Sequence, residues 1–452
     1  MKRKIYQTLL DWKENAKGST ALMIEGARRV GKSYVVKEFA KNEYESHIII
    51  DFNNTTNQIR DLFTGYLHDL DSFFMYLGFY TNVRLKERGT LIVFDEVQMF
   101  PPARAALKYL VQDGRYDYIE TGSLVSIRKN VKDIMIPSEE ETLRMHPMDF
   151  EEFLWALGEE NLMDLVRHQY RKSLPMGQDM HRKLMTLFRQ YMVVGGMPQA
   201  VLKYVQTKDF AQVDRQKRII LTLYRNDISH YANGQNTKVT QIFDELPEQL
   251  QKHEKKFRLS ALKQDARYRD YESAFFWLSD SHVVNICYNS SEPNVGYKLR
   301  RDGNTLKCYM ADTGLLISHS FDENGSVSGE LYRKLILDKI EVNEGMLVEN
   351  IVSQMLVAAG HKLYFYSSYS KEDSTDCMEI DFLISKTTTT SRHNVSAIEV
   401  KSGKNYTLNS LRKFKAKYGN MLGTSYVIHG ADLRVEGDII YLPLYMTPLI
   451  GE

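Results

Sequence analysis

The sequence has few cysteines, no long apolar run and almost no net charge. Its three cysteines, Cys287, Cys308 and Cys377, lie far apart and form no C-x-x-C pair. This spacing argues against a disulfide scaffold and a zinc ribbon, and it fits a reducing compartment. No stretch approaches the ~20 apolar residues of a membrane span, and the N-terminus lacks the apolar core of a signal peptide. We therefore expect a cytoplasmic protein with no membrane partner.

The near balance of charges limits the class of partner. The 452 residues carry 59 Lys and Arg against 58 Asp and Glu, a formal net charge of +1. The chain therefore lacks a global basic field for nucleic acid, and any such binding must use local patches. Its length excludes one compact core and predicts about two to four domains.

One stretch organises the chain. Residues 26–33 fit the phosphate-binding pattern G-x-x-x-x-G-K-[ST] at every fixed position. An apolar run at 20–25 precedes them, and apolar residues at helical spacing follow. Strand, glycine loop and helix form the context in which this motif binds a nucleotide, whereas an ordinary glycine turn needs neither flank. The predicted nucleotide-binding residues are Gly26, Ala27, Arg28, Arg29, Val30, Gly31, Lys32, Ser33 and Tyr34.

The residue types explain how this loop would bind ATP. Gly26 and Gly31 permit backbone angles closed to residues with a Cβ, so successive N–H groups can curl around a phosphate. The helix that begins near Lys32 points its positive end at the same anion. Lys32 can reach the β- and γ-phosphates, and the Ser33 hydroxyl can ligate Mg²⁺.

A second motif ends in two acids. Residues 91–94 are apolar and are followed by Asp95 and Glu96, which places both carboxylates at the C-terminal edge of a buried strand. Asp95 can hold Mg²⁺ through water, and Glu96 can orient or deprotonate an attacking water. Many strands simply end in an acid, but beside a phosphate loop the pair favours hydrolysis. The hydroxyls of Thr121 and Ser123 could contact the γ-phosphate, with a plain glycine turn as an equal alternative.

The N-terminal third alternates between predicted strands and helices, which indicates a parallel α/β sheet. Strands are expected at 20–25, 47–52, 90–95 and 116–121, and helices at 57–63, 71–86 and 103–112. From about 138 to 240 the periodicity is helical, which predicts a helical lid on that sheet.

Residues 257–320 have a different pattern. Short helices at 259–262 and 271–278 precede predicted strands at 284–288, 297–301 and 306–310. Helices followed by a hairpin suggest a winged helix, in which Lys298, Arg300 and Arg301 could touch nucleic-acid phosphates. A structural connector with a solvated basic face is the alternative.

The last 110 or so residues contain a second chemical constellation. A helix at 343–359 carries Glu349, and Asp381 lies on a strand at 379–384. In the next strand, at 396–401, alternation puts Glu399 and Lys401 on one face. Asp381 and Glu399 can hold Mg²⁺ or Mn²⁺ while an ammonium stabilises an attacking hydroxide, and Glu349 could supply a third acid. A surface ion pair would explain Glu399 and Lys401 equally well. A helix at 408–418 and strands at 424–428 and 439–442 follow.

Together these motifs resemble a family of prokaryotic AAA-type ATPases that carry a C-terminal domain known as DUF4143. The resemblance implies an AAA+ core at 1–137, a helical lid at 138–240, a winged helix at 241–330 and a domain similar to the PD-(D/E)xK nucleases at 331–452. The motifs that carry it are residues 26–33, Phe94-Asp-Glu-Val-Gln98, Thr121-Gly-Ser123, Pro147-Met-Asp-Phe-Glu-Glu-Phe153, Gly195-Gly-Met-Pro198, Ala311-Asp-Thr-Gly314, Glu379-Ile-Asp381 and Ile398-Glu-Val-Lys-Ser-Gly403.

The resemblance also implies roles for particular residues. Lys32 and Ser33 match Walker A, Asp95 and Glu96 match Walker B, Thr121 or Ser123 matches the first sensor, and Pro198 matches a proline that sits against adenine. Asp381, Glu399 and Lys401 match the nuclease signature. The arginine finger stays open between Arg104, Arg128 and Arg144. Such ATPases usually complete their site with a neighbouring subunit, which implies a homo-oligomer.

The sequence thus predicts a Mg²⁺-dependent ATPase. Two hypotheses concern what it drives. In the first, ATP gates DNA processing by a metal-dependent C-terminal nuclease. In the second, the protein is a nucleotide-dependent switch whose C-terminal domain binds nucleic acid or a protein partner without cutting it.

Overall fold

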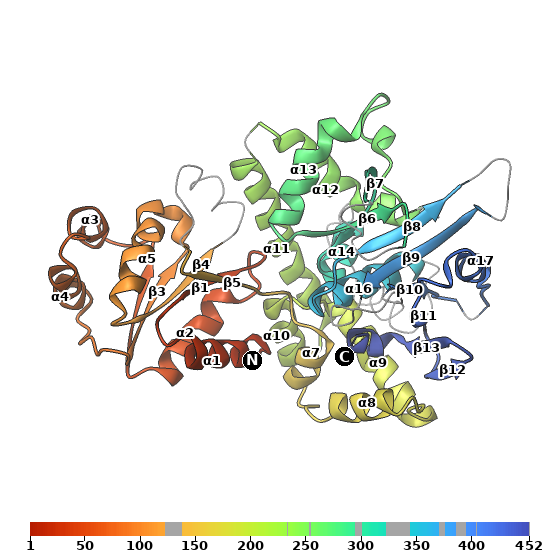
Figure 1. Ribbon diagram of the computed structural model, residues 1–452, viewed down its shortest axis with the longest axis horizontal. Coiled ribbons are helices and arrows are strands. Elements are labelled where there is room, and N and C mark those ends of the chain that lie inside the picture. The colour runs from red at the N-terminus through yellow and green to blue at the C-terminus, as the bar shows by residue number, and fades with distance from the viewer. Residues whose placement is uncertain are drawn as a thin grey trace. The chain divides into compact units, whose positions relative to one another are not determined.

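The computed structural model divides the chain into two compact units, Met1–Pro147 and Met148–Glu452 (Figure 1). It describes residues 1–122, 138–232, 234–252, 255–293, 301–321, 344–369, 376–385, 395–403 and 405–451. Ser123, Arg128, Lys298 and Arg300, and the side chain of Arg301, lie outside the described residues.

The first unit contains a five-stranded parallel sheet in the order β2-β3-β4-β1-β5. This confirms the predicted parallel α/β fold. Strands β1, β3 and β4 are buried along their whole length, as expected for a parallel sheet with both faces covered. The strands are β1 Ala21–Glu25, β2 Ser46–Asp51, β3 Thr90–Asp95, β4 Asp117–Gly122 and β5 Glu140–Arg144, and the helices are α1 Ile5–Ala16, α2 Lys32–Glu43, α3 Asn57–Gly65, α4 Leu70–Thr81 and α5 Pro101–Asp113.

One prediction for this unit needs correction, and one strand was not predicted. The helix expected at 71–86 ends at Thr81, because Asn82 takes a left-handed backbone conformation with φ of 53°. Strand β5 was not predicted, since Glu140–Arg144 is mostly polar and lacks an apolar alternation.

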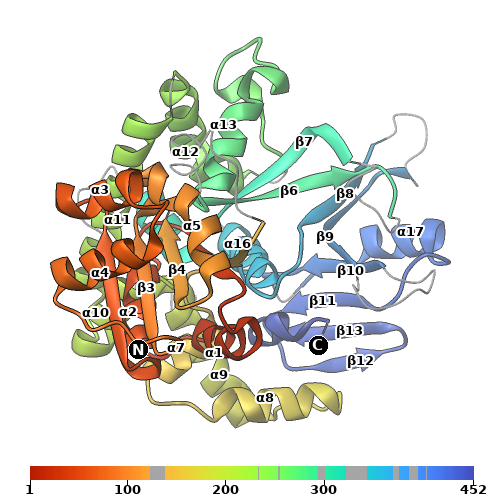
Figure 2. The ribbon, with the colours of Figure 1, turned by 60° about the vertical axis from the view of Figure 1, so that its left-hand side comes forward.

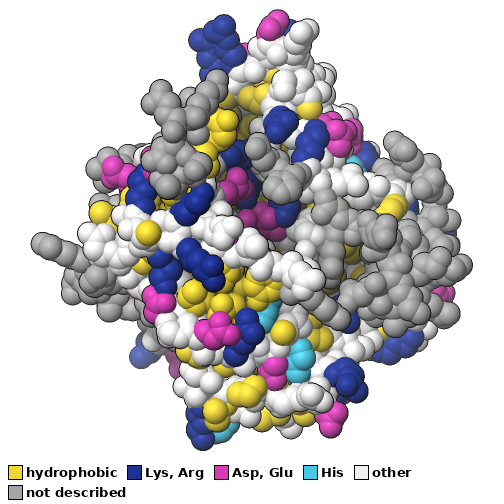
Figure 3. Space-filling model, turned by 90° about the vertical axis from the view of Figure 1, so that its right-hand side faces the viewer, with side chains coloured by type: hydrophobic (Ala, Val, Ile, Leu, Met, Phe, Trp, Pro, Cys, Tyr) yellow, Lys and Arg dark blue, Asp and Glu magenta, His cyan; other side chains and the backbone are white. Residues whose placement is uncertain are grey.

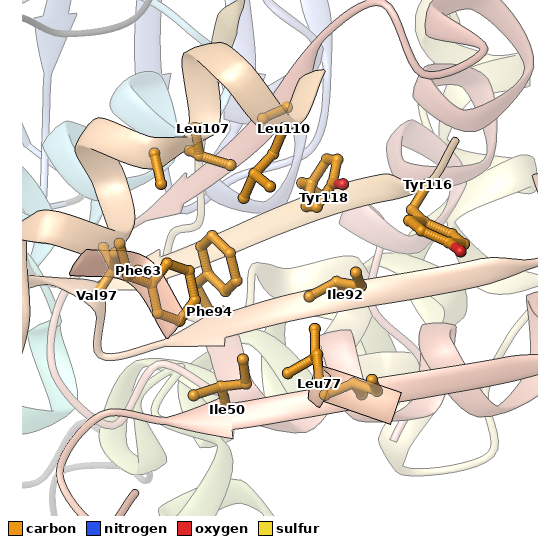
Figure 4. Packing of buried hydrophobic residues seen from close by; sticks show 14 of the residues in the cluster. Ile50, Phe63, Leu77, Ile92, Phe94, Val97, Leu107, Leu110, Tyr116 and Tyr118 are labelled. Carbon is orange, nitrogen blue, oxygen red and sulfur yellow. The ribbon is translucent and has the colours of Figure 1, made fainter. Parts of the chain in front are cut away.

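An apolar core holds the strands in place (Figure 4). Ile50, Phe94 and Tyr118 come from three adjacent strands and belong to one buried cluster with residues of α3, α4 and α5. The rings of Phe63 and Phe94 meet edge to face at 5.4 Å between centroids, a favoured aromatic geometry. This packing holds β2, β3 and β4 against α3, α4 and α5.

The strand register brings the chemical residues to one edge of the sheet. Ile24 of β1 lies opposite Thr121 of β4, and Phe94 of β3 lies opposite Glu120. Strand β4 therefore lies between the strand that precedes the P-loop and the strand that ends at Asp95. Since all three strands are parallel, their carboxyl ends share one edge.

The second unit begins with helices and ends with a sheet. The expected helical stretch is present, and its interpretation as a lid on the first unit stays a prediction. No helix among the described residues is long and apolar enough to cross a membrane. The helices are α7 Phe150–Ala156, α8 Leu162–Arg171, α9 Gln178–Val194, α10 Pro198–Thr207, α11 Phe210–Tyr231, α12 Asn236–Gln251, α13 Tyr268–Asp280, α14 Thr313–Ser320, α16 Glu344–Ala358 and α17 Asn409–Tyr418.

The sheet of the second unit has eight strands in the order β12-β13-β11-β10-β9-β8-β6-β7 (Figure 2). Helix α17 packs on it through Leu411 and Phe414, in a core with Ile380 and Val427. The predicted order of helix, three strands, helix and strand is present as α16, β8, β9, β10, α17 and β11. The strands are β6 Val284–Ser290, β7 Arg301–Met310, β8 Tyr364–Ser368, β9 Met378–Ser385, β10 Val395–Val400, β11 Ser425–His429, β12 Arg434–Glu436 and β13 Ile439–Pro443.

The winged-helix interpretation is not confirmed. Strands β6 and β7 do form an antiparallel hairpin, but β6 also pairs in parallel with β8 through Tyr288 and Asn289. The hairpin is therefore part of the C-terminal sheet. Its apolar residues, such as the buried Cys287 and Cys308, explain this, because a hairpin alone cannot bury them.

Candidate ATP site and C-terminal ion cluster

The P-loop has the backbone that its glycines predict. Gly26 and Gly31 have φ of 155° and 103°, both in the region that favours glycine. At Gly26 a Cβ would lie 2.3 Å from the carbonyl oxygen of Met145. Gly31 is the N-cap of α2, so the amide end of this helix faces the loop. The geometry is that of an anion-binding turn.

Lys32 lies in the loop it is predicted to serve. Lys32 is buried, with 8% of its surface exposed. Its Nζ donates hydrogen bonds to the carbonyl oxygens of Gly26 at 2.9 Å and Ala27 at 3.2 Å. The ammonium is thus held beside the loop by the loop's own backbone. A phosphate bound there would gain a close positive charge.

Three elements bring oxygen atoms together at Asp95. The Ser33 hydroxyl of α2 donates to Asp95 Oδ1 at 2.8 Å, and the Thr121 hydroxyl of β4 donates to the same oxygen. Mg²⁺ prefers such hard oxygen ligands and keeps several waters. The donor set of Ser33 and Asp95 therefore fits a magnesium ion, and the binding of Mg²⁺ by these two residues stays a prediction.

Glu96 follows Asp95 in a strained conformation. Its φ is 53°, a left-handed value that is uncommon for a non-glycine residue and clusters at functional sites. Its backbone N–H donates to Thr121 Oγ1 at 3.4 Å. Its carboxylate Oε2 accepts a 2.5 Å hydrogen bond from Gln98 Nε2. No role was predicted for Gln98, although it lies in the acidic motif at residues 94–98.

Arg3 was also missed. Its guanidinium donates to the carbonyl oxygens of Val30 at 2.8 Å and His146 at 2.6 Å, so it ties the P-loop to the end of the first unit. No local signal could have indicated this, because the partners lie 27 and 143 residues away in the chain.

Two of the three arginine-finger candidates, Arg104 and Arg144, have partners in their own unit, and Arg128 lies outside the described residues. Arg104 is buried and forms a two-pronged ion pair with Glu140, with Nε also 3.6 Å from Glu120. Arg144 Nε lies 3.5 Å from Glu25. The buried position of Arg104 excludes it as a group that reaches into a neighbouring subunit.

Pro198 belongs to the second unit, at the first turn of α10. The preceding Gly196 is packed so tightly that a Cβ would lie 2.1 Å from the carbonyl oxygen of Met148, and its N–H donates to Asp312 at 2.6 Å. The motif at residues 195–198 thus has a clear packing role. Contact between Pro198 and adenine stays a prediction.

The predicted nuclease residues do gather in the second unit. Val400 N–H donates to Asp381 Oδ2 at 2.8 Å, and Lys401 Nζ lies 2.5 Å from Glu399 Oε2. Glu349 of α16 joins the same group. Burial, followed by the nearby Asp381, raises the pKa of Glu399 to about 7.

A lysine that the sequence analysis did not mention lies among these acids. Lys307 of β7 has its Nζ 2.8 Å from Glu379, 3.2 Å from Glu349 and 3.8 Å from Asp381. Burial alone would raise the pKa of Glu349, but Lys307 and Lys255 outweigh it and lower this pKa to about 2. Figure 3 shows one face of the molecule, on which acidic side chains lie beside lysine and arginine side chains.

The expected C-terminal metal site is not supported. Within the described ranges, no three or more His, Cys, Asp or Glu side chains are grouped to hold a metal ion. The physical reason is that Glu349 and Glu379 are already paired with lysines. A metal ion held by Asp381 and Glu399 alone stays a prediction that these contacts do not support.

Comparison with known families agrees with the geometry of the first unit. Residues 18–154 match the model of an AAA domain. Residues 185–324 match a domain of unknown function, DUF8612, and residues 344–446 match another, DUF4143. No curated protein sequence matches the chain.

Several solved structures are similar to the chain at low sequence identity. The Walker-type ATPase of Pyrococcus abyssi is 14% identical, with a TM-score of 0.39, over 70% of this chain and 95% of that one. The ORC2 protein of Aeropyrum pernix, in its ADP form, is 13% identical, with a TM-score of 0.30, over 74% and 92%. DnaA of Aquifex aeolicus, bound to AMPPCP, is 12% identical, with a TM-score of 0.28, over 62% and 87%. The two family matches, at residues 18–154 and 344–446, support an AAA-type ATPase domain joined to a DUF4143 domain.

Proposed function

We propose that the chain binds Mg²⁺-ATP at residues 26–34 and hydrolyses it. The observation that carries this proposal is the meeting of Ser33, Asp95 and Thr121 at one carboxylate oxygen, beside a glycine loop with its lysine. A simple phosphate-binding turn would not need an acid aligned with the loop from a strand two places away.

Each residue has a defined task in this proposal. The backbone N–H groups of the loop and Lys32 bind the phosphates, and Ser33 and Asp95 orient the magnesium ion, which supplies charge neutralisation at the transferred phosphoryl group. Glu96 accepts a proton from, or orients, the water that attacks the γ-phosphorus. Gln98 holds the carboxylate of Glu96 in one orientation.

Two substitutions, Lys32→Ala and Glu96→Gln, test the roles proposed for these residues. Lys32→Ala should abolish binding of a fluorescent ATP analogue, while Lys37→Ala, an exposed lysine on the same helix, should bind normally. Glu96→Gln should keep binding and lose phosphate release by roughly 10²–10⁴-fold. Glu38→Gln, also exposed on α2, is its matched control. Undiminished turnover in Glu96→Gln would remove the proposed base.

For the second unit we propose a nucleic-acid partner, with binding that depends on the nucleotide state. Support comes from exposed basic residues in the segment between α12 and α13 and at the start of α13, namely Arg258, Lys263, Arg267 and Arg269. DNA binding measured by fluorescence anisotropy should weaken steeply with salt and change between ATP and ADP. Absence of binding at low salt would favour a protein partner instead.

We also propose that the ATP site is completed in a homo-oligomer. Light scattering of Glu96→Gln should then show a larger particle with ATP than without nucleotide. An unchanged particle size would contradict a homo-oligomer that forms on ATP binding.

A further inference from the structure

The C-terminal acids and lysines form a cluster whose charge is already balanced. Four carboxylates face four ammonium groups, all within ion-pair distance of at least one partner. The cluster, which we call the ion cluster, consists of Glu349, Glu379, Asp381 and Glu399 with Lys255, Lys256, Lys307 and Lys401. A nuclease metal site has an excess of negative charge that a divalent cation neutralises, and this cluster has no such excess.

Lys307 has the central position. Its side chain is only 1% exposed, and its Nζ lies within 4 Å of carboxylate oxygens from three residues, Glu349, Glu379 and Asp381. It also lies 5.1 Å from the centre of the Phe365 ring. An ammonium with three donors can satisfy such a set of acceptors. A bound metal cation would require the same arrangement of carboxylate oxygens that surrounds Lys307 Nζ.

Two other lysines pair with the glutamate oxygens that Lys307 does not contact. Lys255 binds the second oxygen of Glu349 and the carbonyl oxygen of Gly345, and Tyr309 donates to the first oxygen of Glu349. Lys256 lies 3.4 Å from Glu379 Oε2. Both oxygens of each of these two glutamates are therefore engaged, and neither glutamate can become a metal ligand without losing an ion pair.

We propose that the ammonium of Lys307 takes the place of the divalent metal ion in the C-terminal domain. The domain then holds its acids as a structural ion cluster that joins β7, α16 and β9, and it does not cut nucleic acid through a metal-activated water. A divalent ion entering beside Lys307 would place like charges together in a buried site, which is strongly unfavourable. This inference is independent of the ATP site, because all its residues belong to the second unit.

The first test measures binding of Mn²⁺ to the full chain without nucleotide. Calorimetry gives the number of bound ions, and the electron paramagnetic resonance signal gives the concentration of free Mn²⁺. Wild type and Asp381→Asn should behave alike, with no Mn²⁺ bound in the second unit. Binding of one Mn²⁺ per wild-type chain that is lost in Asp381→Asn would overturn the proposal. Absence of bound Mn²⁺ in the second unit of wild type supports the proposal without any substitution, and Asp381→Asn is compared only after its melting temperature shows that it folds.

The second test removes the ammonium. Lys307→Met leaves the acids without their central cation, so its melting temperature should fall by roughly 5–10 °C and should rise again on addition of Mn²⁺. Lys256→Met, which removes a more exposed lysine of the same cluster, should gain no such response. Equal Mn²⁺ responses in wild type and Lys307→Met would contradict the proposal. If Lys307→Met does not fold, the Mn²⁺ titration of wild type and Asp381→Asn still decides.

A cleavage assay gives an independent readout. Wild type should leave linear, single-stranded and branched DNA intact in Mg²⁺ or Mn²⁺, with and without ATP. Cutting that disappears in Lys401→Ala but persists in Lys32→Ala would overturn the proposal while leaving the ATPase assignment untouched.

Discussion

Asp95 joins three parts of the ATP site through one oxygen atom. Its residue type and its place at the end of an apolar run are the local features from which a metal ligand is predicted. The same holds for Lys32 and Ser33, because the chemistry of the P-loop depends on residues within eight positions of one another. Gln98 and Arg3 were not predicted, since each acts through a side-chain contact that only the folded backbone creates.

Gln98 gives the prediction at this scale. Gln98→Ala removes the donor to Glu96, so the carboxylate is no longer held in one orientation. We expect ATP turnover to fall by up to about 100-fold, with ATP affinity within about twofold of wild type. Steady-state phosphate release and nucleotide binding measure the two effects separately.

Met99→Ala is the matched control, because Met99 lies in the same short 3-10 helix and is exposed. A Gln98→Ala protein with normal turnover, or one that loses turnover and binding together, would show that Gln98 does not position Glu96.

At the scale of elements, β5 illustrates why polar strands escape prediction. Glu140 of β5 forms its ion pair with Arg104 of α5, and Glu120 of β4 lies beside them. The strand is therefore held by parallel pairing with β1 and by a buried ion pair. Helix α14 was missed for the opposite reason, because its residues 313–319 are all buried and show no polar face.

Glu120 makes the stability of the first unit depend on pH. Burial first, and then Glu140, raise its pKa well above 4.5, against the opposing effect of Arg104. The folded state thus binds a proton more tightly than the unfolded state. This contribution is fully favourable below the unfolded pKa and is lost as the pH rises through the folded pKa.

Glu120→Gln should remove that loss. Its free energy of unfolding, relative to wild type, should rise by roughly 1 kcal/mol or more between pH 5 and pH 8. Urea unfolding can be followed by Trp12, the tryptophan of the first unit, after Trp155→Phe and Trp277→Phe remove the other two. Glu38→Gln, an exposed acid, should show no such trend, and a parallel pH dependence in the two variants would refute the assignment.

At the scale of the whole molecule, the chain divides at residue 147, and the C-terminal sheet begins before residue 331. We expect fragments 1–147 and 148–452 each to fold. A fragment 331–452 should not, because it lacks β6 and β7 and with them Lys307, which would leave buried acids unpaired.

Circular dichroism during thermal unfolding distinguishes these outcomes. A cooperative transition is expected for the first two fragments and none for the third. Cooperative unfolding of 331–452 alone would support the domain boundary expected from the sequence and contradict the role given to β7.

The sequence by itself predicted the parallel sheet around residues 26–33 and the order of elements from α16 to β11, because glycine conformations, strand alternation and the chemistry of neighbouring residues are local properties. Only the tertiary structure decided that the β6–β7 hairpin joins the C-terminal sheet and that Lys307 lies among its acids. Lys307 and Glu349 are 42 residues apart, and Lys255 and Glu349 are 94 apart. Contacts over such separations depend on strand pairing and helix packing, which no local pattern encodes.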